Sequence, residues 1–96
     1  MNGGERSVSV DKNMVLRQVG AKIAYWRTIK GFTQADLAKT TGFSKTTISK
    51  LECGNYNENI SLSHIIDIAD ALEIDFTVLL RFSVPERDMW IVNEPE

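Results

Sequence analysis

Residues 33–54, TQADLAKTTGFSKTTISKLECG, constrain the fold of this chain more than any other stretch. Thr33 and Ser44 are residues that commonly begin helices, because a side-chain oxygen can accept a hydrogen bond from an early backbone N–H. Gly42 is a residue that commonly ends one, because glycine enters the left-handed backbone conformation without strain. The stretch therefore predicts a short helix at about 34–41, a tight turn, and a second short helix that starts at Ser44.

The second of these helices has two faces of opposite character. Ile48 and Leu51 fall on one face, and the other carries polar and basic residues: Lys45, Thr46, Ser49 and Lys50. A helix of this kind can pack against a core and present its other face to the major groove, where each base pair shows a distinct pattern of donors, acceptors and methyl groups. Lysine suits the acceptors of guanine, and threonine suits a hydrogen bond or the thymine methyl. We therefore predict base contacts from Lys45, Thr46 and Lys50.

Residues at the ends of the two helices are suited to the DNA backbone. Gln34 and Ser44 lie where helices begin, and the N–H groups of a first helical turn favour phosphate oxygens. Asn55 follows the second helix directly and is placed for a similar contact. We expect these three residues to position the protein on a duplex.

The charge of the chain is unevenly distributed, which explains how an acidic protein could bind a polyanion. The formal net charge is −2. Residues 12–50 carry eight basic side chains and one acid, a net charge of +7, whereas residues 51–96 carry ten acids and two arginines, a net charge of −8. The local field steers a charged partner more than the total charge does. The alternative is a solvated helix surface with no partner.

Two further segments have apolar residues at spacings of three and four, which predicts helices at about 12–30 and 61–72. A short helix at 76–80 completes a set of five. With 96 residues the chain is long enough for one domain and not for two. We expect residues 1–11 to form a flexible arm, in which a strand at 7–10 would need a partner edge.

The C-terminal segment breaks the helical pattern. The sequence has a proline at position 85, which we expect to stop a helix, and then a short apolar run with strand-forming residues: Met89, Trp90, Ile91 and Val92. Such a run is costly to expose in a small monomer. We predict that it pairs across a two-fold axis with a second copy, and packing against helices of the same chain is the alternative. Residues 55–59, NYNEN, predict a turn.

The sequence lacks the patterns of catalytic and metal sites, so we expect no enzyme, no metal and no cofactor. Cys53 is the single cysteine and cannot form an intrachain disulfide. We expect its thiol to be half-buried and inert, with an exposed, redox-sensitive thiol as the alternative. No apolar run reaches the length of a membrane span, and the N-terminus has no secretory signal. These observations favour a cytoplasmic protein.

The motif residues Thr33–Gln34, Leu37–Ala38, Gly42, Ile48–Ser49, Leu51–Glu52 and Gly54 resemble the helix-turn-helix of the Cro/C1 (XRE) repressor family. The resemblance extends from about 19 to 80. It implies an all-α, compact five-helix, lambda-repressor-like domain, here at 12–81. The extension at 82–96 lies outside the resemblance, and its apolar run is what predicts a dimerisation arm. The resemblance also implies that the third helix lies in the major groove of a palindromic operator bound by a dimer.

By position, the resemblance assigns roles to individual residues. Phosphate contacts would come from Gln34, Ser44, Thr47 and Asn55, and base contacts from Lys45, Thr46 and Lys50. Arg27 on the first helix would form a structural ion pair with Glu52, which removes that acid from the DNA surface.

Two functions follow from these observations. The first is a sequence-specific transcriptional regulator, a homodimeric repressor that binds a double-stranded DNA operator. The alternative is the antitoxin of a toxin–antitoxin pair, which would bind a toxin protein through residues 82–96 and regulate its own operon.

Overall fold

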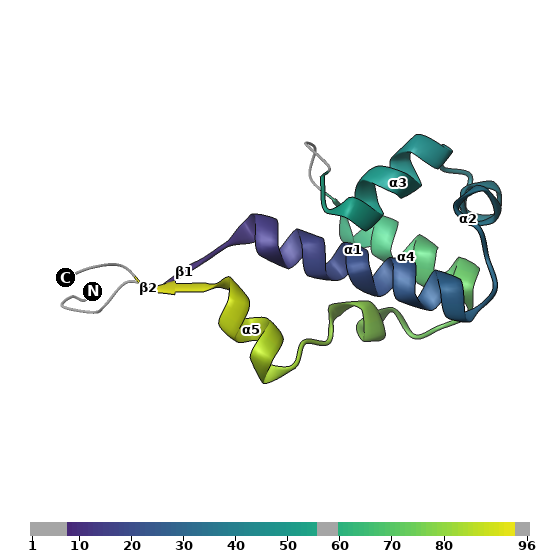
Figure 1. Ribbon diagram of the computed structural model, residues 1–96. Coiled ribbons are helices and arrows are strands. Elements are labelled where there is room, and N and C mark those ends of the chain that lie inside the picture. The colour runs from purple at the N-terminus through teal and green to yellow at the C-terminus, as the bar shows by residue number, and fades with distance from the viewer. Residues whose placement is uncertain (1–7, 56–59, 94–96) are drawn as a thin grey trace.

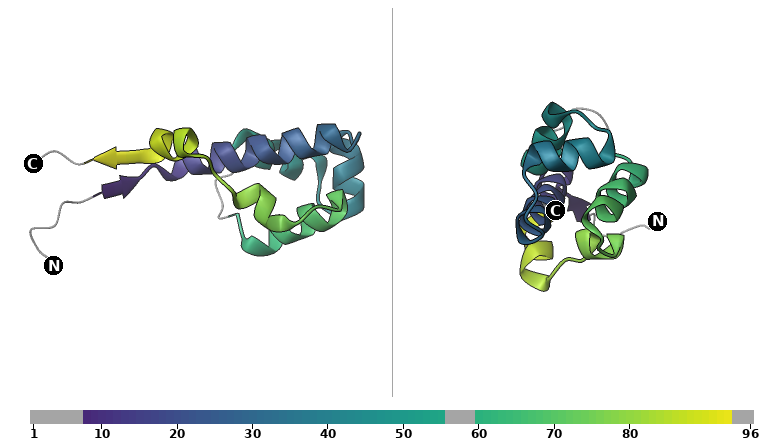
Figure 2. Two further views of the ribbon diagram at one scale, coloured as in Figure 1. Left: turned by 90° about the horizontal axis from the view of Figure 1, so that it is seen from below. Right: turned by 90° about the vertical axis from the view of Figure 1, so that its right-hand side faces the viewer.

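The computed structural model describes residues 8–55 and 60–93. A long helix, α1 (Lys12–Ile29), runs through the middle of the molecule. Two short helices, α2 (Gln34–Thr41) and α3 (Lys45–Cys53), lie on one side of it (Figure 1). The helix α4 (Leu62–Leu72) lies next to α1 and α2, as the end-on view in Figure 2 also shows. The predicted all-α helix-turn-helix fold is confirmed.

The core lies between α1, α2, α3, α4 and the 3-10 helix η1 (Phe76–Leu80). The largest side chains with no more than 2 % exposure come from each of these elements: Ile23, Leu37, Ile48, Leu51, Ile68, Leu72 and Leu79. This cluster is the apolar face that the spacing of three and four predicts. The cluster fixes the orientation of α3, because Ile48 and Leu51 on one side of that helix are buried in it.

The ends of the two short helices match the sequence prediction. Thr33 caps α2 in a reciprocal arrangement with Asp36, in which each backbone N–H donates to the other residue's side-chain oxygen, at 2.9 and 3.0 Å. The hydrogen bond from the Thr33 N–H, and then that from its hydroxyl, hold the pKa of Asp36 below its usual value. Gly42 ends α2 at φ 84° and Gly54 ends α3 at φ 66°, the left-handed conformation that favours glycine.

The expectation that Pro85 stops a helix is wrong. Pro85 lies in the first turn of a further helix, α5 (Val84–Trp90), where its missing N–H would have no partner anyway. Ser83 caps this helix together with Glu86. Met89 and Trp90 are therefore helical, and of the predicted strand-forming run only Ile91 and Val92 lie in a strand.

Two short strands form an antiparallel pair at the end of the molecule away from α2 (Figure 1). They are β1 (Val8–Val10) and β2 (Ile91–Asn93), with Ser9 opposite Val92. The partner of β2 in this structure is thus a strand of the same chain, and pairing with a second copy across the other edge stays a prediction. We call this pair the strand arm. Residues 1–7 and the predicted turn residues 56–59 lie outside the described part.

Candidate nucleic-acid interface

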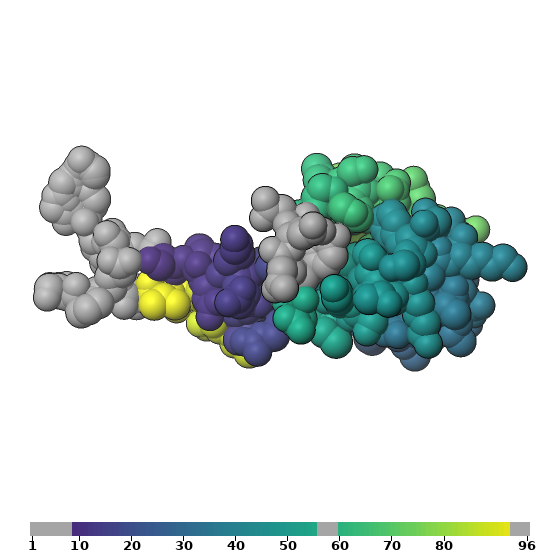
Figure 3. Space-filling view, turned by 90° about the horizontal axis from the view of Figure 1, so that it is seen from above, coloured from purple at the N-terminus to yellow at the C-terminus, as the bar shows by residue number. Residues whose placement is uncertain are grey.

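The face of α3 that the sequence predicts to read bases is its exposed side, opposite the core. Ile48 is fully buried, whereas Lys45, Thr46 and Lys50 are all exposed. Figure 3 shows the surface of α3, in teal, open on one face of the molecule. The structure thus places the three predicted base-contacting side chains together, on a helix whose opposite side is held by the core.

The start of α3 is held by two hydroxyl groups. The Ser44 Oγ accepts a hydrogen bond from the Thr47 N–H at 3.0 Å and donates to the Thr47 hydroxyl oxygen at 2.9 Å. Both residues are predicted phosphate contacts. Ser44 is the N-cap of α3 and Thr47 lies in its first turn, where backbone N–H groups lack helical partners. Their hydroxyls fix the first turn, and the free N–H groups of that turn are suited to an anion.

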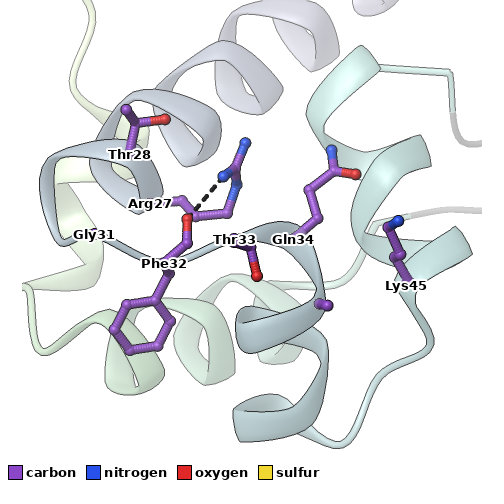
Figure 4. A pocket seen from close by; sticks show the side chains of 8 residues that line it. Arg27, Thr28, Gly31, Phe32, Thr33, Gln34 and Lys45 are labelled. Atoms are coloured by element: carbon purple, nitrogen blue, oxygen red, sulfur yellow. Dashed lines mark hydrogen bonds between the residues drawn. The ribbon is translucent and has the colours of Figure 1, made fainter.

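Gln34 lies at the start of α2, and its side chain turns toward α3. Its Nε2 donates to the Glu52 Oε1 at 3.0 Å. Gln34 and Lys45 both line a hollow of about 410 Å³ between the starts of α2 and α3 (Figure 4). The side chain of Gln34 is thus already engaged within the protein, and the start of α2 remains open to the hollow.

An ion pair joins α1 to α3 behind this hollow. The Arg27 Nε lies 2.6 Å from the Glu52 Oε2, and its Nη2 donates to the other carboxylate oxygen at 3.0 Å. A third bond runs from the Arg27 Nη1 to the Phe32 carbonyl at 2.8 Å (Figure 4). The hydrogen bond to Glu52 raises the pKa of Arg27 above its usual value. The side chain of Glu52 is only 6 % exposed, so its carboxylate is engaged inside the protein and does not face a phosphate backbone.

Sequence reasoning assigned no role to Gly20, which sets the distance between α1 and α3. A Cβ atom built on Gly20 would lie 2.3 Å from the Leu51 carbonyl oxygen and 2.5 Å from that of Glu52. Only glycine lets the two helix backbones approach this closely. A glycine inside an otherwise helical pattern is a known sign of close packing, and it was the available signal.

At the other end of α3, Asn55 is exposed and its N–H donates to the Lys50 carbonyl at 3.0 Å. It borders a second hollow, of about 580 Å³, with residues from the start of α1. Cys53 borders the same hollow and is exposed, which corrects the expectation of a half-buried thiol.

The four residues predicted for dimerisation lie around the junction of α5 and the strand arm. Met89, Ile91 and Val92 are 60 %, 42 % and 47 % exposed. Trp90 packs edge-on against Phe82 at 4.7 Å between ring centroids. Met89, Ile91 and Val92 therefore form an exposed apolar surface, whereas Trp90 packs within its own chain.

Polar contacts attach α5 to α1. The Lys22 Nζ lies 2.5 Å from the Glu86 Oε2, and the Gln18 Nε2 donates to the Glu86 carbonyl at 2.9 Å. The hydrogen bond from Lys22, followed by that from the Ser83 N–H, lowers the pKa of Glu86. Gln18 is buried, and its Oε1 has no hydrogen-bond partner within the described part of the chain.

The described residues contain no group of three or more histidine, cysteine or acidic side chains that could hold a metal ion. Within the same ranges, no helix is both long and apolar enough to cross a membrane.

The chain matches the helix-turn-helix family model over residues 23–79. A relative from Methanocaldococcus jannaschii, an uncharacterized HTH-type transcriptional regulator, is 31% identical over 75 residues, which are 78% of this chain and 96% of the relative.

Three solved structures show a similar fold. The restriction-modification controller protein C.AhdI from Aeromonas hydrophila has a TM-score of 0.62 and 33% identity, over 67% of this chain and 94% of its own. The biofilm master regulator SinR, solved in complex with DNA, has a TM-score of 0.61 and 25% identity, over 66% and 98%. The hypothetical transcription factor NHTF from Neisseria has a TM-score of 0.67 and 27% identity, over 93% and 95%.

Proposed function

The chain belongs to the Cro/C1-type helix-turn-helix family of DNA-binding transcriptional regulators, and from that premise we propose that it is a homodimeric repressor of a palindromic operator. The observation that supports this most is the character of α3, buried on its Ile48 side and basic and polar on its exposed side. Occupancy of the operator would exclude polymerase from the promoter.

In this proposal the two kinds of DNA contact come from different parts of the α2–α3 unit. Lys45, Thr46 and Lys50 read base edges, because they are exposed on the face of α3 away from the core. Phosphates are held at the helix ends, by Gln34, Ser44, Thr47 and Asn55. For Gln34 we favour the backbone N–H at the start of α2, since its side chain already donates to Glu52.

We propose that the second copy docks through the strand arm and the exposed Met89. A sheet of two three-residue strands is marginal alone in water, and both outer edges of this sheet lack a strand partner among the described residues. Val10, Ile91 and Val92 expose apolar surface at the same place. The strand arm also lies beyond the N-terminal end of α1, on the side of the molecule toward which α3 ends (Figure 1). A two-fold axis at the arm would therefore set two α3 helices along one face of a duplex.

The alternative use of this surface is a protein partner of another kind, as in an antitoxin. It is favoured by the charge of residues 51–96, which is −8 and would attract a basic toxin. A basic protein that co-purifies in a fixed ratio and blocks the arm would support the alternative. A chain that purifies alone as a dimer supports the repressor.

Selection of bound duplexes from a random pool tests the DNA-binding proposal. We expect an inverted repeat with half-sites about one helical turn apart, roughly 34 Å. The variant with Lys45→Ala and Thr46→Ala should keep weak, salt-sensitive binding and lose preference for the selected site, since the phosphate contacts remain and Lys50 is the one base-reading side chain left. Thr77→Ala with Arg81→Ala, two exposed residues in and after η1, serves as a control for site preference. Retained preference in the α3 variant would show that α3 is not the reading helix.

Truncation after Leu80 tests the dimer surface. The shortened chain keeps the core, including Leu79, and should remain folded. We expect a mostly monomeric protein in analytical ultracentrifugation, with weaker binding to the selected duplex. An unchanged dimer would exclude α5 and the strand arm as the contact.

A further inference from the structure

We propose that Arg17, with Asn13 and Asn55, forms an additional phosphate-binding site beside the C-terminal end of α3. This inference rests on the proposed DNA-binding function and extends the interface onto the first half of α1. That half precedes the family match, which begins at residue 23. The site would therefore be a feature of this chain beyond the helix-turn-helix itself.

The site is the hollow of about 580 Å³ between the start of α1 and the end of α3. Asn13 and Arg17 are four residues apart on α1, which places them on one face of that helix. Both are exposed, as are Asn55 and Cys53 on the opposite wall. The lining thus presents a guanidinium and two carboxamides, which are hydrogen-bond donors to an anion.

Close backbone packing fixes the distance between the two walls. A Cβ atom built on Gly54 would lie 2.5 Å from the Arg17 Cα. Gly54 has φ 66°, so it both ends α3 and brings the chain against α1. Arg17 and Asn55 are consequently held on either side of a contact that leaves no room for a larger residue.

The chemistry of the hollow favours phosphate. Among the described residues Arg17 makes no ion pair, in contrast to Arg27 and Lys22, whose charges are matched by carboxylates. A planar guanidinium can donate two parallel hydrogen bonds to phosphate oxygens. Two of the last carbonyls of α3, those of Leu51 and Lys50, accept hydrogen bonds from the Gly54 and Asn55 N–H groups, which reduces their repulsion of an anion.

The position of the hollow suits a duplex that lies on α3. Figure 3 shows the first turns of α1, in purple, and α3, in teal, on the same face of the molecule. A helix of nine residues spans about 13 Å, close to the roughly 12 Å width of the major groove. Groups at the start of α3 and groups in this hollow can therefore contact the two backbones that border the groove.

A purely structural role for Arg17 is the competing explanation. A cation near the C-terminal end of α3 stabilises the helix dipole, and this would require no DNA. The two explanations differ in what a loss of the charge changes: the salt dependence of DNA binding in one case, and only the thermal stability in the other.

The experiment compares Arg17→Gln with Arg81→Gln, which removes the same charge from the segment between η1 and α5, on the side of α1 away from α3 (Figure 1). Binding of the full chain to a 30-base-pair duplex of mixed sequence is measured by fluorescence anisotropy at several salt concentrations. We expect Arg17→Gln to reduce the slope of log K against log salt by about 0.9, the loss of one phosphate contact. Arg17→Lys should keep most of the slope, and Arg81→Gln should keep all of it.

A slope unchanged in Arg17→Gln, with or without a lower melting temperature, would overturn the site and leave the proposed function intact. Absence of DNA binding by the unaltered chain would instead overturn the proposed function together with the site.

Cys53 provides an independent measurement, because it lines the hollow and is the only thiol of the chain. Saturating duplex should slow its alkylation by iodoacetamide several-fold in the unaltered chain, and less in Arg17→Gln. An alkylation rate that duplex does not change would contradict a phosphate in the hollow.

Discussion

The α2–α3 unit and the region formed by α5 and the strand arm are both attached to α1, but by different forces. The α2–α3 unit contributes Leu37, Ile48 and Leu51 to the core. None of the described side chains of α5 is buried. Its main links to α1 are the bonds that Gln18 and Lys22 make to Glu86, with the Phe82–Trp90 ring contact beside them.

This difference follows from what each region has to do in the proposed function. A reading helix must present its side chains in one geometry, and buried apolar contacts supply that rigidity because they cannot be exchanged with water cheaply. A surface that docks a second copy needs accessible apolar area and open strand edges. Polar attachments are weaker in water, so the arm can adjust while α3 stays fixed.

The two described ion pairs give the sharpest test of this comparison. Glu52→Ala leaves Arg27 largely buried without its partner and should lower the free energy of unfolding by about 3–5 kcal/mol. Glu86→Ala removes the more exposed pair, whose carboxylate side chain is 30 % exposed, and should cost about 0.2–1 kcal/mol. Urea denaturation of both variants measures this. Equal losses, or an unchanged stability in Glu52→Ala, would remove the distinction.

Glu52→Ala should also weaken DNA binding only through stability. At a temperature where the variant remains folded, its preference among duplexes should match that of the unaltered chain. A changed preference would place Glu52 at the DNA and not in the fold.

Gly20→Ala tests whether close packing of α1 on α3 holds the reading helix. Alanine normally favours a helix interior over glycine, but here its Cβ would lie 2.3 Å from a backbone oxygen. We expect a loss of about 1–3 kcal/mol in thermal unfolding, with weaker DNA binding as α3 shifts. Gly31→Ala is the control: no atom lies within 4 Å of its Cβ, so only the strain of φ 79° acts. A stabilised Gly20→Ala would contradict the close approach.

The smallest expected effect is a loosening of α5 in acid. The pKa of Glu86 is lowered in the folded state, so its contribution is complete above the unfolded carboxyl value of about 4.3. That contribution is lost as pH falls through the lower folded value. Amide chemical shifts of α5 should therefore change in this range.

The start of α2 provides the contrast in the same titration. It loses the cap of Asp36, whose pKa is also lowered, yet its buried Leu37 should keep it in place. Glu86→Gln should abolish the pH dependence in α5 alone. If α2 loosens before α5, burial is not what separates the two regions.

The sequence was most informative where structure depends on neighbours along the chain. Thr33, Ser44 and Gly42 mark the helix ends of the α2–α3 unit because capping bonds and left-handed turns involve residues only a few positions apart. The spacing of Ile48 and Leu51 identified the buried side of α3 for the same reason. Pro85 shows the limit of prediction from neighbouring residues, because a proline can follow the end of one helix or lie in the first turn of another. The pair Ser83 and Glu86, three residues apart, was the signal that decides for a beginning.

The sequence by itself therefore determined the helix-turn-helix, its amphipathic reading helix and the basic charge of its surroundings. Only the tertiary structure decided that β2 pairs with β1, that Gly20 and Gly54 bring α3 against α1, and that Arg17 and Asn55 border one hollow. The physical reason is range. Caps and helical periodicity are fixed by bonds within a turn or two, whereas strand pairing, backbone approach and the walls of a hollow join distant parts of the chain and exist only once the core has formed.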